Sequence, residues 1–178
     1  MRSLVLRPRC LDRFDGNAFR RRLDAHLRRW GIAYAVLLCG AAWFHAHYAF
    51  GLNGSPSLPH RLFLMEKGTL PSRDEYVAFR WAGGGPYPAG VTFVKVIAGI
   101  PGDVVSCADR DFYVNGAPVG RAKTTSRQGV PLDPGPTGTL PAGRYYVRAP
   151  HPDSLDSRYR LTGWIAESQI IGRAHALF

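Results

Sequence analysis

The sequence predicts a mainly β domain preceded by one N-terminal transmembrane helix. Two observations support this fold class: an uncharged, largely apolar stretch at 30–50, and short segments rich in Val, Tyr and Phe that are separated by Gly and Pro from Asn53 onward. With 178 residues, the chain has room for one ordinary globular domain plus accessory segments. We therefore expect a basic arm at 1–29, a membrane anchor at 30–50 and a β domain at 51–178.

The arm at 1–29 carries most of the positive charge. It has nine arginines against three aspartates, a net charge of +6 (9 − 3), out of +10 for the whole chain. Phe19, Leu23, Leu27 and Trp30 recur at helical spacing among these arginines, which predicts a basic amphipathic helix that contacts anionic lipid headgroups. Nucleic-acid binding is the competing use of such an arm, and it is not the partner we expect.

The stretch that follows has the length of a membrane crossing. No Asp, Glu, Lys or Arg lies between Arg29 and Arg61, and about 20 apolar residues span a bilayer. His45 and His47 make the distal third half-polar. Because cytoplasmic flanks carry the arginine excess, we expect the N-terminus in the cytoplasm and the β domain in the periplasm, on a bacterial inner membrane. A cleaved signal peptide is the alternative, but its basic region would be unusually long and no small-x-small site follows.

The three cysteines agree with this topology. Cys10 falls in the expected arm, Cys39 in the expected span and Cys107 in the β domain, so no two share a compartment where they could pair. We expect no disulfide framework. The chain has no CxxC or histidine spacing of a metal site, and no cofactor is expected.

The strand predictions rest on β-branched and aromatic segments between turn residues. Asn115-Gly116 is typical of a two-residue hairpin, and 120–141 is polar and rich in Pro and Gly, as in a surface loop. Residues 163–174 predict either a final strand pair or a short helix and strand. The predicted strands are Tyr76–Trp81, Val91–Ile97, Phe112–Val114, Ala117–Val119 and Arg144–Val147.

Lys95 lies within an apolar, β-branched run, Val91–Ile100, that reads as a buried strand. Alternation along a strand puts it on the same face as Phe93 and Ile97. Burial disfavours an ammonium and can lower a lysine pKa by about 3 to 5 units, which would give the neutral amine that a general base requires. The alternative is a lysine whose stem packs on apolar surface while its ammonium reaches water. The run alone leaves both open.

A serine lies between two prolines just after the uncharged stretch, in Ser55–Pro59. The prolines stiffen the backbone around Ser57. A serine hydroxyl becomes a good nucleophile when a neighbouring base removes its proton, and a neutral lysine can be that base. Ser57 and Lys95 could form such a pair, although a serine that caps a turn is the simpler reading of this segment alone.

Four blocks occur in an order and spacing that resemble the type I signal peptidase family. They are Ser55–Pro59, Phe93–Asp103, Asn115-Gly116 and Asp153–Tyr159. The Ser-Leu-Pro form of the first block looks most like the TraF-type conjugative-transfer peptidases, which mature pilin-like substrates and in some systems yield a cyclic pilin. The resemblance implies a serine endopeptidase with a β domain of the kind shared with repressor autoproteases, and the family uses no histidine or metal in catalysis.

The resemblance also implies roles for individual residues. Ser57 matches the nucleophile and Lys95 the general base. Ser55 matches an oxyanion donor, and Ser154 a serine that orients the lysine amine. A structural ion pair near the site is matched by Asp156 with Arg158. Without the resemblance, Ser154 and Asp156 read as parts of a turn built on side-chain hydrogen bonds.

The chain departs from the family pattern in three places. Leu58 replaces the Met that usually follows the nucleophile, Val96 replaces an Arg after the lysine, and Ala149–Pro152 replaces a Gly-Asp-Asn stretch. The first difference conserves volume, and the other two favour the conjugation branch, with a prepilin or other exported precursor, the bilayer and the conjugation or secretion machinery as partners. The alternatives are a general signal peptidase and a non-catalytic assembly factor. A repressor-type autoprotease fits poorly, because those proteins are cytoplasmic.

Overall fold

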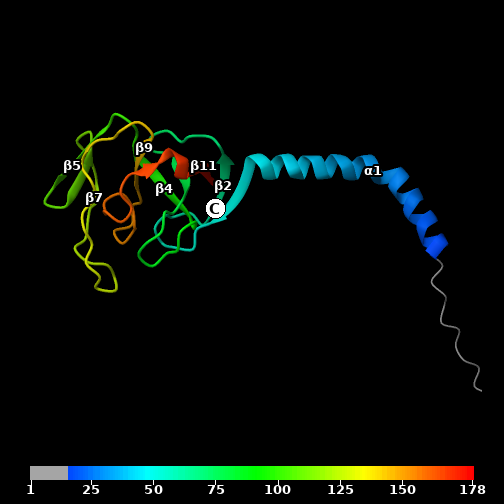
Figure 1. Ribbon diagram of the computed structural model, residues 1–178, viewed down its shortest axis with the longest axis horizontal. Coiled ribbons are helices and arrows are strands. Elements are labelled where there is room, and N and C mark those ends of the chain that lie inside the picture. Colours follow the sequence, from blue (N-terminus) through cyan, green and yellow to red (C-terminus); the bar gives the residue numbers. More distant parts are fainter. Residues whose placement is uncertain (1–15) are drawn as a thin grey trace, which may run out of the picture. The chain divides into compact units, whose positions relative to one another are not determined.

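The computed structural model describes residues 16–178 and divides into two compact units, Met1–Trp43 and Phe44–Phe178. Residues 1–15, which include part of the predicted arm and Cys10, lie outside the described part. Helix α1 runs without a break over Gly16–His47 (Figure 1). The helix predicted from the spacing of Phe19, Leu23 and Leu27 is therefore present.

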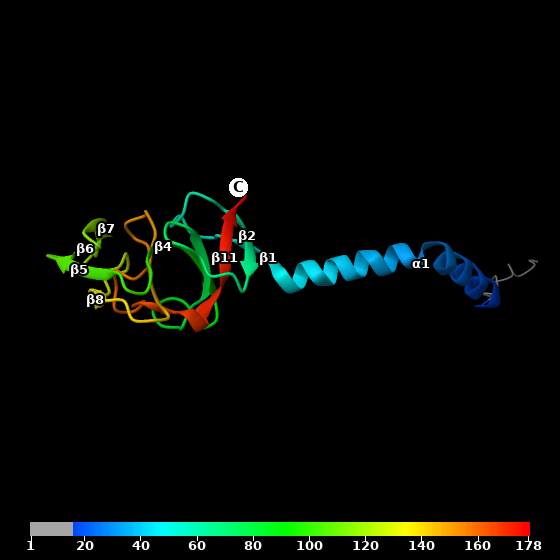
Figure 2. The ribbon, with the colours of Figure 1, turned by 90° about the horizontal axis from the view of Figure 1, so that it is seen from above.

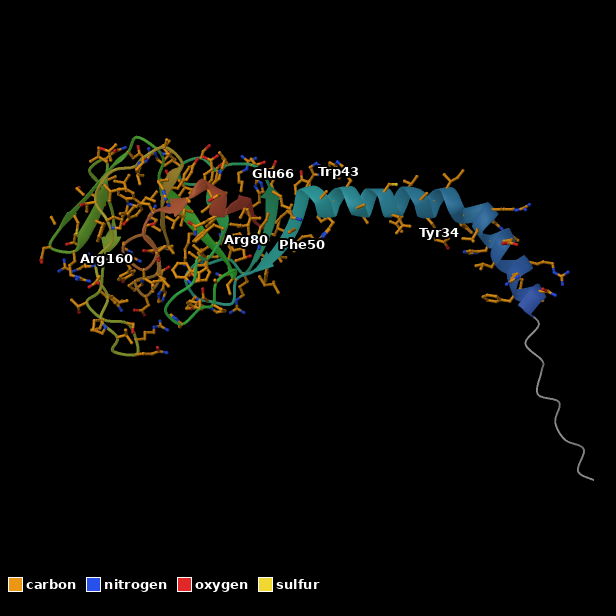
Figure 3. The ribbon with its side chains drawn as sticks, in the orientation of Figure 1. Tyr34, Trp43, Phe50, Glu66, Arg80 and Arg160 are labelled. Carbon is orange, nitrogen blue, oxygen red and sulfur yellow. The ribbon has the colours of Figure 1, made fainter. Side chains whose placement is uncertain are left out.

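The membrane-spanning helix predicted at 30–50 is not found. Across residues 16–178, no helix is both long enough and apolar enough to cross a membrane. The helix ends at His47, and strand β1, Tyr48–Leu52, takes up the last three residues of the predicted span. His45 and His47 lower the apolarity of its final turn. Side chains along the helix are exposed, including Trp43 at 59% (Figure 3).

A seven-stranded antiparallel sheet forms the main layer of the second unit. Its strand order is β1-β2-β11-β3-β4-β9-β10, and β11 lies beside β2 in Figure 2. The remaining strands of this sheet are β2 Leu62–Lys67, β3 Tyr76–Arg80, β4 Thr92–Gly99, β9 Arg144–Arg148, β10 Ile165–Ala166 and β11 Ile170–Ala176.

A second, four-stranded sheet has the order β7-β6-β5-β8. It consists of β5 Val104–Ala108, β6 Asp111–Val114, β7 Ala117–Arg121 and β8 Gly138–Thr139. Asn115 and Gly116 join β6 to β7 with φ angles of 49° and 79°. Positive φ at both central residues suits the twist of a two-residue hairpin, so the predicted turn is confirmed.

All five predicted strands are present, with ends that differ by at most two residues. The C-terminal segment consists of β10, a 3-10 helix at Glu167–Gln169, and β11. Of the two predictions for this segment, the short helix followed by a strand is therefore the correct one. Strands β2 and β5 were not predicted from the sequence, and the first three residues of β1 were assigned to the membrane span. The segment 120–141 is mostly exposed, but it begins inside β7 and includes β8.

The two faces of β4 contribute to different core clusters, and this placement buries the middle of the strand. Ile97 packs in a cluster with Phe79 and Trp81. Val94 and Val96 pack against a second cluster that contains Leu58 and Phe63. Side chains alternate along a strand, so Lys95 shares the side of Ile97 and lies between apolar neighbours.

Candidate active site

The predicted nucleophile lies in a turn just after β1 that the side chain of Asn53 organises. The Asn53 amide nitrogen donates to the carbonyl oxygens of Leu58 (3.5 Å) and His60 (3.1 Å), and its Oδ1 accepts from the Ser55 backbone N–H at 3.1 Å. Leu58 is 4% exposed and anchors the turn in the core. Sequence reasoning missed Asn53, although its place two residues before Ser55 fits an Asx turn.

Within this turn the two serine hydroxyls are hydrogen-bonded to each other. Ser55 Oγ and Ser57 Oγ are 2.8 Å apart, and Ser55 Oγ also donates to Asn53 Oδ1 at 3.0 Å. Since the Ser55 proton is used by Asn53, the Ser57 hydroxyl is the donor in the serine pair. Ser57 is buried, whereas Ser55 is exposed.

Lys95 occupies the centre of β4 and is only 5% exposed. Its Nζ donates to Ser154 Oγ at 2.7 Å and lies 5.8 Å from the centre of the Phe93 ring. Burial lowers the pKa of Lys95 from 10.5 to about 8. The positive charge of Arg158 adds to this lowering, and the negative charge of Asp156 opposes it. The lysine is therefore buried rather than extended to water, and a substantial fraction is neutral near physiological pH.

Ser154 reaches Lys95 from the loop after β9. It is 3% exposed, and its backbone N–H donates to the His151 carbonyl oxygen at 3.1 Å. A short turn thus fixes the hydroxyl that accepts the hydrogen bond from Lys95 Nζ. The contact predicted from the resemblance is present, although its catalytic consequence stays a prediction.

Asp156 and Arg158 form a bidentate ion pair behind the site. Arg158 Nε and Nη2 donate to the two carboxylate oxygens at 2.8 and 2.9 Å, and both residues are buried. Asp156 also accepts the Ala149 N–H at 3.1 Å, and Arg158 donates to the His151 carbonyl at 3.2 Å. Paired charges that satisfy each other and the backbone can remain buried. This pair holds the loop that carries Ser154.

Ser157 was missed by the sequence reasoning and reinforces the same loop. It is fully buried, its Oγ accepts the Val147 N–H at 2.9 Å, and its own N–H donates to the Val147 carbonyl at 3.0 Å. These two bonds tie the loop back onto β9. A small serine between two charged residues gives no sequence signal for this role.

Ser57 and Lys95 line one cavity of about 460 Å³, together with Ser55 and Ser154. Asp156 and Arg158 do not line it. In the described part of the chain no hydrogen bond joins Ser57 to Lys95, because each is bonded to another serine. Catalytic hydrogen bonds are often absent or long before substrate binds. The arrangement can supply a nucleophile, a base and a hydroxyl that holds the base in place.

One wall of this cavity is an open strand edge. β3 pairs with β4 along Thr92–Val96, but on the other side β9 pairs only from Val96 onward. Among the described strands, nothing pairs with that second edge over Thr92–Val94, and these residues line the cavity. An extended polypeptide could complete the sheet there.

A comparison with protein families identifies the chain. The family model described as "Signal peptidase, peptidase S26" matches residues 24–178. The chain belongs to this family. Its members are serine peptidases, which agrees with the family predicted from the four sequence blocks. The TraF-type branch stays a prediction.

Individual relatives of this S26 peptidase cover less of the chain. Signal peptidase I T of Bacillus subtilis (strain 168) is 35% identical over 97 residues, which are 49% of this chain and 49% of the relative. The chain thus spans about half the length of the curated relative it matches. A crystal structure of a signal peptidase I from Enterococcus faecalis V583 covers 61% of this chain and 97% of its own at 24% identity, with a TM-score of 0.40.

Proposed function

We propose that this S26 family member is a serine endopeptidase that cleaves exported precursor proteins, with Ser57 as nucleophile and Lys95 as general base. The observation that carries the proposal is the shared cavity: a buried lysine whose pKa is lowered to about 8 lines the same space as a serine hydroxyl held in a turn. A lysine in this state can accept a proton near neutral pH.

Catalysis begins with a change of hydrogen-bond partner. The Ser57 hydroxyl turns from Ser55 toward the neutral Lys95 amine, which takes its proton as Ser57 Oγ bonds to the scissile carbonyl carbon. The negative charge that develops on the carbonyl oxygen would be met by the Ser57 backbone N–H and by the Ser55 hydroxyl, whose proton must first turn away from Asn53 Oδ1. One such donor is typically worth about 2.7 to 4 kcal/mol of barrier.

The same lysine then acts as an acid. The Lys95 ammonium passes its proton to the leaving amine, the C–N bond breaks, and an acyl-enzyme on Ser57 remains. Lys95, neutral again, takes a proton from the attacking water and passes it to Ser57 Oγ as the acyl C–O bond breaks, which releases the acid product and restores both the serine hydroxyl and the neutral amine. Throughout these steps, Ser154 Oγ holds the Lys95 amine in place by accepting a hydrogen bond from it.

Substrate binds in extended form along the open edge of β4. Backbone groups of Thr92–Val94 would hydrogen-bond to the substrate strand and bring its scissile bond toward Lys95 at the end of that edge. We expect small side chains in the substrate next to the cleaved bond.

Two variants test the dyad. Ser57→Ala and Lys95→Arg should each block the maturation of a precursor followed by gel electrophoresis, since arginine keeps its proton at any accessible pH. Lys67→Arg, a lysine outside the cavity, is the matched control and should process normally. Normal maturation in either dyad variant would refute the mechanism.

A mechanism-based acylating probe separates an enzyme from a non-catalytic assembly factor. The wild-type chain should be labelled at Ser57, and the label should be located by mass spectrometry of the digested protein. The Ser57→Ala variant should take none. An unlabelled wild-type chain, together with normal function of the alanine variant, would favour the assembly factor.

For the substrate, we propose a pilin-like subunit of a conjugative transfer system, with cyclisation if an amine replaces water at the acyl-enzyme. The support is the Ser-Leu-Pro form of the segment around Ser57. Purified chain should cleave a prepilin faster than a secretory precursor. The reverse preference would instead make it a general signal peptidase. Mass spectrometry distinguishes cyclisation from hydrolysis, because the cyclised product is lighter than the hydrolysed product by one water molecule.

For the location, we propose the bacterial inner membrane, with lipid as a partner of α1 and the β domain acting on the periplasmic side. The arginines before Trp30 suit anionic lipid headgroups, and exposed apolar side chains on the helix, such as Ile32 at 83%, support lipid contact. The periplasmic side is proposed because exported precursors emerge there. Labelling of a Ser126→Cys variant in intact cells by a membrane-impermeant thiol reagent tests it, in a Cys107→Ser background. If the cysteine at position 126 is labelled only after the cells are lysed, the periplasmic location is wrong.

A further inference from the structure

A second groove, larger than the catalytic cavity, lies directly beside it. It has a volume of about 1040 Å³ and is formed by residues 85–87, 126–128, 130–133, 153–155 and 159–161. The two hollows share a wall made of Tyr87, Arg127, Asp153, Ser154 and Leu155. The groove therefore adjoins the site that holds Ser57 and Lys95, and Ser154 lines both hollows.

Exposed apolar side chains line this groove. Tyr87 is 41%, Val130 55% and Leu161 42% exposed. Charges of both signs accompany them: Asp153 is paired with Arg127, while Arg160 (Figure 3) and Asp133 make no ion pair within the described residues. The charges are balanced, so the groove favours an apolar ligand over one of a particular sign.

The outer wall is held in a fixed position rather than left as a free loop. The Asp153 carboxylate binds both Lys123 and Arg127, the latter at 2.7 Å, and so ties 123–127 to the residue next to Ser154. From the other side, Arg110 donates to the carbonyl oxygens of Ala122 (2.9 Å) and Leu132 (2.7 Å). Both ends of the wall are anchored, so the groove exists before any ligand binds.

The size of the groove indicates what occupies it. Pockets for small molecules measure about 300 to 1,000 Å³, and this groove is slightly larger and adjoins a second cavity. An extended chain that lies across both hollows fits this arrangement. A small ligand would leave much of the apolar wall exposed.

We infer that the groove is a second substrate site, which binds an apolar flanking segment of the same polypeptide whose bond lies at Ser57. The inference rests on the proposed peptidase function and adds to it a specificity determinant outside the catalytic cavity. Tyr87, Val130 and Leu161 contact that segment, and the wall at 123–132 presents it. Cleavage should then depend on sequence at a distance from the cut, in addition to the small residues next to it.

The test compares a short fluorescent peptide, with alanines around the cleaved bond, with the same peptide lengthened on either side by a leucine-containing segment. For one of the two extensions, kcat/KM should rise about tenfold, as expected for the partial burial of one large apolar side chain. Val130→Glu should remove this gain and leave cleavage of the short peptide unchanged. Val104→Glu, the same change at a residue that is 50% exposed on β5 and outside the groove, should keep it.

Binding of the same peptides to the Ser57→Ala chain, followed by fluorescence anisotropy, tests the groove without catalysis. The longer peptide should bind about tenfold more tightly, and Val130→Glu should abolish the difference. Equal affinity for short and long peptides, or an equal loss in both valine variants, would overturn the inference. If the wild type cleaves neither peptide but binds the long one through Val130, the peptidase proposal fails while the groove stands.

Discussion

If Lys95 acts as the general base, catalysis depends on the fraction of the enzyme in which its amine has lost the proton. Burial lowers the pKa of this lysine from 10.5 to about 8. At pH 7 about one tenth of the molecules then carry the neutral amine, about 300 times the fraction that an unshifted lysine would give. The fold, rather than the residue type, makes the base available.

The pH profile of kcat/KM for a fluorogenic peptide measures this directly. The rate should rise about tenfold per pH unit below pH 8 and level off above it, because only the neutral amine accepts the Ser57 proton. The folded domain must remain intact over the range, which circular dichroism at each pH checks. A flat profile, or one that rises until about pH 10.5, would refute the assignment of Lys95.

A lysine titration by NMR gives an independent measurement. The chain has only three lysines, Lys67, Lys95 and Lys123, so a sample labelled at the lysine ε-carbon gives few signals. One of them should titrate near pH 8 and disappear in the Lys95→Met variant. Should the lost signal titrate at the ordinary lysine value, the lowered pKa would be wrong whatever the kinetics show.

The same shift predicts how stability depends on pH. The unfolded chain keeps the Lys95 proton up to about pH 10.5, whereas the folded chain releases it near pH 8. Between these values the unfolded state binds more protons, so the free energy of unfolding rises with pH. The cost of the buried ammonium, about 3 kcal/mol at about 1.36 kcal/mol per pKa unit, is fully present below pH 8 and relieved above 10.5.

Urea denaturation of Lys95→Met should therefore lack this rise. The variant loses the Ser154 hydrogen bond at every pH. This loss lowers its unfolding free energy by the same amount at each pH, so it does not change how that free energy varies with pH. Wild type and variant should differ in their change of unfolding free energy between about pH 7 and pH 10 by up to about 3 kcal/mol. Parallel curves would contradict the burial argument.

Three further substitutions probe the surroundings of the site. Arg158→Met leaves the fully buried Asp156 carboxylate without its partner and should cost about 3 to 5 kcal/mol of unfolding free energy in urea, whereas Arg121→Met, from an exposed pair, should cost at most about 1; equal losses would argue against the buried pair. Gly135→Ala places a Cβ too close to the backbone carbonyl oxygen of Ser157, in the loop after β9, and the required backbone shift should cost about 1 to 3 kcal/mol, so an unchanged urea midpoint would contradict the close approach. Ser55→Ala should lower kcat about 10²- to 10³-fold with little change in KM, and an unaltered kcat would remove this residue from the oxyanion site.

Local features of the fold were predictable because they depend on neighbouring residues. Asn115-Gly116 gave a hairpin since both residues tolerate positive φ, and the β-branched run around Lys95 gave a strand. Strand β1 was misread for the same reason. Tyr48–Phe50 continue an uncharged stretch, and only pairing with β2 shows that they belong to a sheet.

The sequence by itself determined the family, the strand that carries Lys95 and the stiff turn that carries Ser57. Only the tertiary structure decided that Asn53 and Ser157 hold the two turns, and it brought Ser154, 59 positions from Lys95 in the chain, within hydrogen-bond distance of the amine, as the family resemblance implied. It also placed a second groove next to the catalytic cavity. The physical reason is that backbone preferences are local, whereas the loss of water around an amine depends on which distant segments pack over it.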